Sequence, residues 1–197
     1  KRQLFQPLMI LNLEFDYRPK ASLQKMRDAS ISVPFADIPF SPYKLTMSMF
    51  LAELLGYATR AEQQGDALFH FLMDSILWLD QAESNFSNFH IVFMIKLTAY
   101  LGFFPNIESG AGMDYFDLVD GCFVSAVPTH RNYLDAEDSM RMVHLLRLDY
   151  KTMHLYTMSR SDRNRCIEVL LLYYRIHLPS FPELKSYSVL KDMFSTM

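Results

Sequence analysis

Cysteine, glycine and tryptophan are scarce in this chain of 197 residues, which has two cysteines, six glycines and one tryptophan. Two cysteines provide neither a disulfide framework nor the paired CxxC spacing of a zinc site. With so few glycines, the sequence contains no GxxxxGK[ST] or GxGxxG loop that would cradle a phosphate. No apolar run reaches the roughly 18 residues that span a bilayer, so we expect no membrane partner.

Motifs for metal-assisted or nucleophilic catalysis are also missing. The six histidines are scattered without an HExxH pair, and there is no GxSxG and no local Cys–His signature. His90, His144 and His177 lie in helical contexts, where a hydrogen-bonded or exposed histidine is more common than a metal ligand. Cys122 and Cys166 fit buried, reduced thiols. We therefore predict no catalytic residue, no metal and no cofactor.

Charge is unevenly distributed. The net charge is −3, yet the first 33 residues hold six basic and three acidic side chains, and residues 141–177 hold seven basic and three acidic ones. Half of the residues are hydrophobic and 21% are charged, as in a globular protein with one good core. Basic character is therefore concentrated in two segments of a mildly acidic chain.

Two segments near the beginning predict β-strands. Apolar and polar residues alternate from Leu4 to Tyr17 and again from Leu23 to Val33, which is the period of a half-buried strand. An isolated hairpin is marginal in water, so we expect these strands to belong to a domain that begins upstream. Lys1 in place of an initiator methionine agrees with that expectation.

The pattern changes to helices after residues 34–42, a linker marked by three prolines. Apolar residues then recur at spacings of three and four. Helices are predicted to begin at Ser41 or Pro42, at Asp66, at Ser87 or Asn88, at Asp135, at Ser161 or Asp162, and at Ser186 or Ser188. The third helix is apolar on nearly all sides and ends at Gly102, so we expect it to be central and buried.

Residues 103–134 form an insert between helices. Two short apolar runs flank Asp120-Gly121, a strong signal for a β-hairpin. His130 follows the second run and could form a local hydrogen bond.

Two groups of basic residues are candidates for binding. Arg160, Arg163 and Arg165 cluster at a helix start, where cations oppose the helix dipole. The plainer interpretation is a solvated surface with an Asp162–Arg165 pair, and the alternative is a patch for nucleic-acid phosphate or an acidic peptide. In the strands, the aromatic residues Phe5, Phe15 and Tyr17 lie near Arg18, Lys20 and Arg27, as in small barrels that stack single-stranded nucleic acid.

Several short motifs occur in an order that resembles the RecO family of bacterial recombination mediators over essentially the whole chain. They are MSMFLAELL, Leu101-Gly102-Phe103 with Pro105, YFDLVDGCFV, and HLPSFPELKSYSVL with Leu184-Lys185-Ser186. The resemblance implies a mainly α fold, with a helical-bundle domain over 43–197 that carries a short β-hairpin insert at 103–134. The last two strands of a partial OB-fold, 1–33, and the linker 34–42 would precede it, so the chain resembles an N-terminally truncated member.

The insert departs from zinc-bearing members of the family, which carry two CxxC pairs there. The four corresponding positions are Gly110, Met113, Ser125 and Pro128. None of them supplies a thiolate, and Cys122 lies beside these positions. The resemblance therefore implies a zinc-less branch in which aromatic residues, namely Tyr115, Phe116 and Phe123, hold the insert together.

By resemblance, the chain is a non-catalytic mediator of DNA repair and recombination in the bacterial cytoplasm, associated with the nucleoid. It would bind single- and double-stranded DNA, anneal strands, and work with RecR to load RecA onto DNA coated by single-stranded-DNA-binding protein (SSB). DNA contacts would come from Arg18, Lys20, Lys25 and Arg27, with an affinity that falls steeply with salt. The acidic, Phe-ended SSB tail would need a hydrophobic pocket rimmed by Lys96 or by Arg160, Arg163 and Arg165. The alternative is a helical protein-interaction domain that does not bind DNA.

Overall fold

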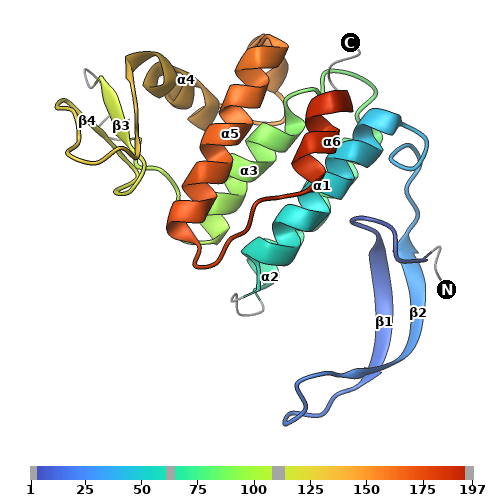
Figure 1. The fold of residues 1–197 in the computed structure, drawn as a ribbon. Helices are drawn as coiled ribbons and strands as arrows, with labels where there is room; N and C mark the ends of the chain where they lie inside the picture. The colour runs from blue at the N-terminus through green and yellow to red at the C-terminus, as the bar shows by residue number, and fades with distance from the viewer. Residues whose placement is uncertain (1–3, 61–64, 108–113, 194–197) are drawn as a thin grey trace.

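A computed structural model describes residues 4–60, 65–107 and 114–193. Its elements, in chain order, are β1 (Ile10–Asp16), β2 (Lys25–Val33), α1 (Pro42–Ala58), α2 (Asp66–Gln81), α3 (Phe89–Tyr100), β3 (Tyr115–Asp117), β4 (Cys122–Val124), β5 (Tyr133–Leu134), α4 (Ala136–Leu146), a 3-10 turn (Met153–Leu155), α5 (Arg160–His177) and α6 (Ser186–Met193). Figure 1 shows a helical bundle with a small sheet at one side and a long hairpin projecting from the other. The prediction of a mainly α fold with a β insert is confirmed.

The hairpin pairs β1 with β2 in antiparallel register, so that Leu13 faces Ala29 and Phe15 faces Met26. Both strands begin later than the alternation predicted, at Ile10 and Lys25. Large apolar side chains of the hairpin are exposed, among them Phe15 at 50% and Tyr17 at 73%. The two strands are confirmed, while their membership of an OB-fold remains a prediction.

Helix α3 is the centre of the bundle. Its side chains from Ile91 to Ile95 are at most 3% exposed, and α2, α4 and α5 pack around it. The hydroxyl of Tyr174 on α5 donates a 2.7 Å hydrogen bond to the carbonyl of Met94. Gly102 follows the end of the helix with a φ of +82°, a backbone conformation that favours glycine. The predicted central, buried helix is confirmed.

Side-chain caps set the starts of α1 and α4 where the sequence indicates them. The Ser41 side chain accepts from the backbone N–H of Lys44 with Pro42 in the first turn, and the Asp135 side chain accepts from the N–H of Asp138. The predicted start of α5 is wrong. Its cap is Ser159, since a capping box between Ser159 and Asp162 outcompetes the later positions.

The insert folds as a three-stranded antiparallel sheet in the order β4-β3-β5. Gly121 turns between β3 and β4 with a φ of +63°. The rings of Phe116 and Phe123 meet edge to face at 4.8 Å, and Phe116 also contacts Tyr173 of α5. Aromatic packing within the described part of the insert agrees with the predicted role of Phe116 and Phe123, and the contact with Tyr173 also joins the insert to the bundle.

The remaining predictions for the insert have mixed outcomes. His130 forms the expected local hydrogen bond, in which its Nδ1 accepts from the N–H of Asn132 at 3.2 Å. Its Nε2 also lies 3.1 Å from Oδ2 of Asp117. Of the four positions that correspond to zinc ligands in relatives, Ser125 is exposed and Pro128 is partly buried. Gly110 and Met113 lie outside the described residues.

No helix within the described ranges is long and apolar enough to cross a membrane.

Candidate functional site

An open pocket of about 770 Å³ lies between α2, the C-terminal half of α3 and the segment around Tyr150. We call it the aromatic pocket. Its lining residues are Ala67, His70, Phe71, Asp74, Ser75 and Trp78 from α2, Lys96, Ala99 and Tyr100 from α3, and Phe104, Asp149, Tyr150 and Lys151 from loops. A volume in this range is typical of ligand-binding pockets.

Stacked rings form the walls of the aromatic pocket. Phe71 and Tyr100 lie almost parallel with their centroids 4.5 Å apart, and Trp78 stacks on Tyr150 at 5.2 Å. The Tyr150 hydroxyl donates a 2.8 Å hydrogen bond to Oγ of Ser75, and burial raises the pKa of this tyrosine well above its usual value. These rings thus make the walls aromatic and largely apolar.

Two lysines stand at the edge of this apolar surface. Lys96 is partly buried and Lys151 is exposed. Among the residues that the structure describes, neither ammonium forms a salt bridge with a carboxylate. The nearby Asp149 is occupied by the hydroxyl and backbone N–H of Thr152 and by the N–H of Lys151, and these hydrogen bonds, together with the Lys96 charge, lower its pKa. The pocket therefore combines apolar walls with two lysines, and the carboxylates of Asp74 and Asp149 also line it.

The hairpin gathers its basic side chains at the end that is farther from the helices. Arg18 and Lys20 lie in the connecting turn, which Gln24 braces by hydrogen bonds to Arg18, and Lys25 and Arg27 follow on β2. Arg27 pairs with Asp16 at 2.8 Å, and all four basic residues are exposed. The structure brings them together, and their role in DNA binding remains a prediction.

The family model described as "Recombination protein O C terminal" matches residues 39–187. The chain belongs to the RecO family. A DNA repair protein RecO from Phocaeicola vulgatus is 46% identical over 195 residues, which covers 99% of this chain and 81% of the relative. Its counterpart from Bacteroides fragilis is 44% identical over 98% of this chain and 81% of the relative, and that from Porphyromonas gingivalis is 29% identical over 98% and 80%. Membership of this family supports a role in DNA repair and recombination.

Only one of the residues that we predicted to bind a protein partner, Lys96, lines the aromatic pocket of this RecO-family chain. The arginine cluster of α5 lies elsewhere and is engaged in structural contacts. Arg160 donates to the carbonyl of Lys191, and Arg163 donates to Oδ1 of Asn88. Burial lowers the pKa of Arg163. The two candidate rims therefore lie at separate places on the bundle, and their role in binding a partner remains a prediction.

The surface pair that we expected between Asp162 and Arg165 is not the one that forms. Arg165 pairs with Asp138 at 2.7 Å, and Asp162 pairs with Arg141 at 3.2 Å. The capping box points the Asp162 carboxylate back toward Ser159, away from its neighbour one turn along the helix.

Sequence reasoning missed most of the aromatic pocket. Phe71, Trp78 and Tyr150 look like core residues in the sequence, and Lys151 looks like an ordinary surface lysine. A signal existed in the spacing of Phe71 and Trp78, which lie on one face of a helix. Tyr150 contacts a residue 75 positions away, a pairing that no local pattern reveals.

The described residues contain no group of three or more histidine, cysteine and acidic side chains that could hold a metal ion. Cys122 is partly buried and Cys166 is buried, and both are free. Burial raises the pKa of Cys166 to about 11 and also raises that of Cys122. Neither thiol has the lowered pKa of a reactive cysteine.

Proposed function

We propose that this RecO-family chain is a non-catalytic adaptor of DNA repair and recombination. Its aromatic pocket would capture the acidic, Phe-ended tail of SSB, and its basic hairpin would contact DNA. As its family resemblance implies, it would anneal complementary strands and act with RecR to load RecA. The observation that carries the proposal is the aromatic pocket with Lys96 and Lys151 at its edge.

The chemistry of the aromatic pocket matches such a tail at both of its ends. A terminal phenylalanine ring gains offset or edge-to-face contacts with Phe71, Tyr100 and Trp78. The terminal carboxylate and the acidic side chains before it would be neutralised by the ammonium groups of Lys96 and Lys151. Complementary charge at the rim of an apolar pocket speeds association and selects an acidic partner over a basic one.

The test is the affinity of the chain for a fluorescent acidic peptide that ends in phenylalanine. Lys96→Ala and Lys151→Ala each remove one cation from the rim, and together they should weaken binding by about tenfold or more. Ala99→Trp places a ring in the aromatic pocket without removing a core residue, and should block the peptide. Lys185→Ala, an exposed lysine outside the pocket, is the matched control and should bind like the native chain.

The peptide itself offers a second control. Replacing its terminal phenylalanine with alanine should abolish binding, because the apolar walls then lose their occupant. Native affinity for that altered peptide, or native affinity of Ala99→Trp for the original one, would rule out the aromatic pocket as the tail site.

A further inference from the structure

The carboxylate of Asp80, near the C-terminus of α2, holds three consecutive backbone N–H groups of the linker. Oδ2 accepts from Ala36 at 2.8 Å, and Oδ1 accepts from Asp37 at 3.0 Å and from Ile38 at 2.9 Å. Asp80 is only 7% exposed. Charge-assisted hydrogen bonds from successive N–H groups to one buried carboxylate fix the course of the backbone that donates them.

Lys44 of α1 also holds the same segment. Its ammonium pairs with Oδ2 of Asp37 at 2.7 Å and donates a 3.0 Å hydrogen bond to the carbonyl of Asp80. The side chain is 1% exposed, with its ammonium over the ring of Phe86. Because a buried cation is costly unless it is paired, this arrangement favours one position of Asp37. Ile38, 2% exposed, anchors the segment in the core.

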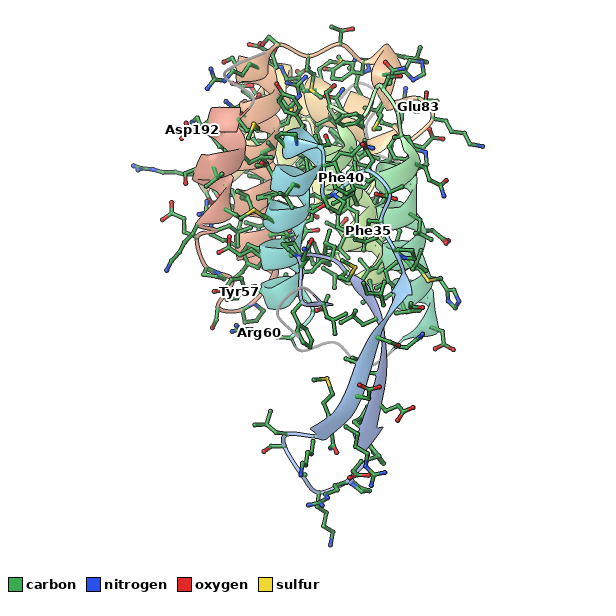
Figure 2. All side chains as sticks on the ribbon, turned by 90° about the vertical axis from the view of Figure 1, so that its right-hand side faces the viewer. Phe35, Phe40, Tyr57, Arg60, Glu83 and Asp192 are labelled. Carbon is green, nitrogen blue, oxygen red and sulfur yellow. The ribbon has the colours of Figure 1, made fainter. Side chains whose placement is uncertain are left out.

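Residues 36–38, which Asp80 and Lys44 hold, lie at the base of the hairpin, where it joins the helices. Strand β2 ends at Val33, three residues before Ala36. Figure 1 shows the hairpin leaving the helices at this place and extending away from them, and Figure 2 shows Phe35 and Phe40 at the junction. The direction of the hairpin therefore depends on how firmly residues 36–38 are held.

Helix α2 carries both Asp80, which holds residues 36–38, and side chains that form a wall of the aromatic pocket. Asp80 follows Trp78 by two residues on α2, and Ser75 and Phe71 lie about one and two turns before Trp78. Helix α2 thus contacts residues 36–38 at the base of the hairpin and also lines the aromatic pocket.

We propose that Asp80 is a positioning residue that latches the linker and so fixes the direction of the hairpin relative to the aromatic pocket. DNA on the hairpin and a peptide tail in the pocket would then be held at a set separation, a consequence that rests on the proposed function. The latch itself is a property of the fold and can be tested alone.

The direct test is the distance between two spin labels, one on the hairpin turn and one on α6. Leu23→Cys and Val189→Cys provide exposed sites, in a chain whose own cysteines are replaced by Cys122→Ser and Cys166→Ala. The native latch should give one narrow distance distribution. Asp80→Asn puts an amide NH₂ against a linker N–H, and should give a broad one. Glu83→Gln, an exposed change of the same charge three residues away, is the control and should leave the distribution narrow. An unchanged distribution in Asp80→Asn overturns the proposal.

Amide exchange separates a freed linker from a loosened fold. In Asp80→Asn, exchange of the Ala36, Asp37 and Ile38 amides should accelerate by about tenfold or more, while the amides of α3 keep their native protection. Equal acceleration in α3 would mean that Asp80 serves the whole fold, and would overturn a positioning role.

The functional consequence is tested with a bivalent ligand, a single-stranded oligonucleotide joined by a short linker to the acidic Phe-ended peptide. Tethering raises the affinity only when both sites are held at a spacing that the linker can span. Asp80→Asn should weaken bivalent binding several-fold, with separate affinities for peptide and DNA unchanged. If the native chain shows no avidity although the label distances respond to Asp80, the proposed function fails and the latch stands.

Discussion

At the residue scale, three carboxylates accept hydrogen bonds from backbone N–H groups in a linker, a turn and the start of a helix. Asp80 receives the linker, and Asp117 accepts from the N–H groups of Val119 and Asp120 in the turn after β3. Glu53 of α1 receives the start of α6 through the N–H of Lys185 and the N–H and hydroxyl of Ser186. Each joins parts of the chain whose unpaired backbone donors would otherwise be costly to bury.

Glu53 makes the attachment of α6 dependent on pH. Burial alone would raise the pKa of this carboxyl, but hydrogen bonds from Ser186 and Lys185 outweigh it and lower the pKa below its usual value. A lowered folded-state pKa means that the stabilisation is complete above the ordinary pKa of a glutamate, about 4.3, and is lost as the pH falls through the lowered value. Glu53→Gln should therefore be less stable than the native chain at neutral pH, by a margin that shrinks in acid.

Denaturant unfolding across a pH series measures that margin. Glu83→Gln, in which the altered side chain is exposed, should track the native chain throughout. A margin for Glu53→Gln that stays constant down to strongly acidic pH would show that the Glu53 charge is not what holds α6.

Gly121 tests how tightly the insert sits on α5. A Cβ at this position would lie 2.7 Å from the hydroxyl oxygen of Tyr173, which is 1% exposed and already donates to the carbonyl of Phe103. The positive φ adds strain for any other residue. Gly121→Ala should lower the free energy of unfolding by about 1–3 kcal/mol, as measured by denaturant titration.

Gly56 is the matched control for that substitution. It is an exposed position of α1 where an added Cβ meets nothing within 4 Å. Gly56→Ala should raise the stability by up to about 1 kcal/mol through helix propensity. Equal effects of the two substitutions would mean that the contact with Tyr173 does not constrain the turn.

At the scale of elements, sequence patterns predicted the helix ends that depend on residues close together in the sequence. The caps at Ser41 and Asp135 and the glycine end of α3 were all foreseeable, because each depends on residues within four positions. The start of α5 was not, because several polar residues compete at 159–162 and only the reciprocal Ser159–Asp162 contacts decide between them. The aromatic pocket was not predicted because its walls come from three segments that are distant from one another in the sequence.

The capping box of α5 gives a direct comparison of two serines. Ser159→Ala removes the side chain that accepts from the N–H of Asp162, and should cost about 1 kcal/mol of unfolding free energy. Ser161→Ala, at one of the two positions that the sequence pattern indicated, changes an exposed side chain in the first turn and should be nearly neutral. Thermal unfolding of both variants distinguishes the two caps, and a larger loss for Ser161→Ala would refute the assignment to Ser159.

At the scale of the whole molecule, the structure shows where the unevenly distributed charged residues lie. The four basic residues of the hairpin lie together on an exposed projection. In contrast, several arginines of α4 and α5 form ion pairs with Asp138 and Asp162 or a hydrogen bond within the bundle. The acidic surplus of the remaining chain would repel DNA from the helices. If this chain binds DNA, the hairpin is therefore where phosphate contacts would concentrate.

That distribution predicts how DNA binding responds to salt. Each lost phosphate contact should reduce the slope of log affinity against log salt by about 0.7 for single-stranded DNA. Arg18→Gln, Lys20→Gln and Lys25→Gln should each show this loss in fluorescence anisotropy, while Arg27→Gln should show less because Arg27 is already paired with Asp16. Lys185→Gln, on the helical part, should leave the slope unchanged. Binding that is absent even at low salt, with the acidic peptide still bound, would instead favour the alternative of a helical protein-interaction domain, since the aromatic pocket does not depend on the hairpin for any of its lining residues.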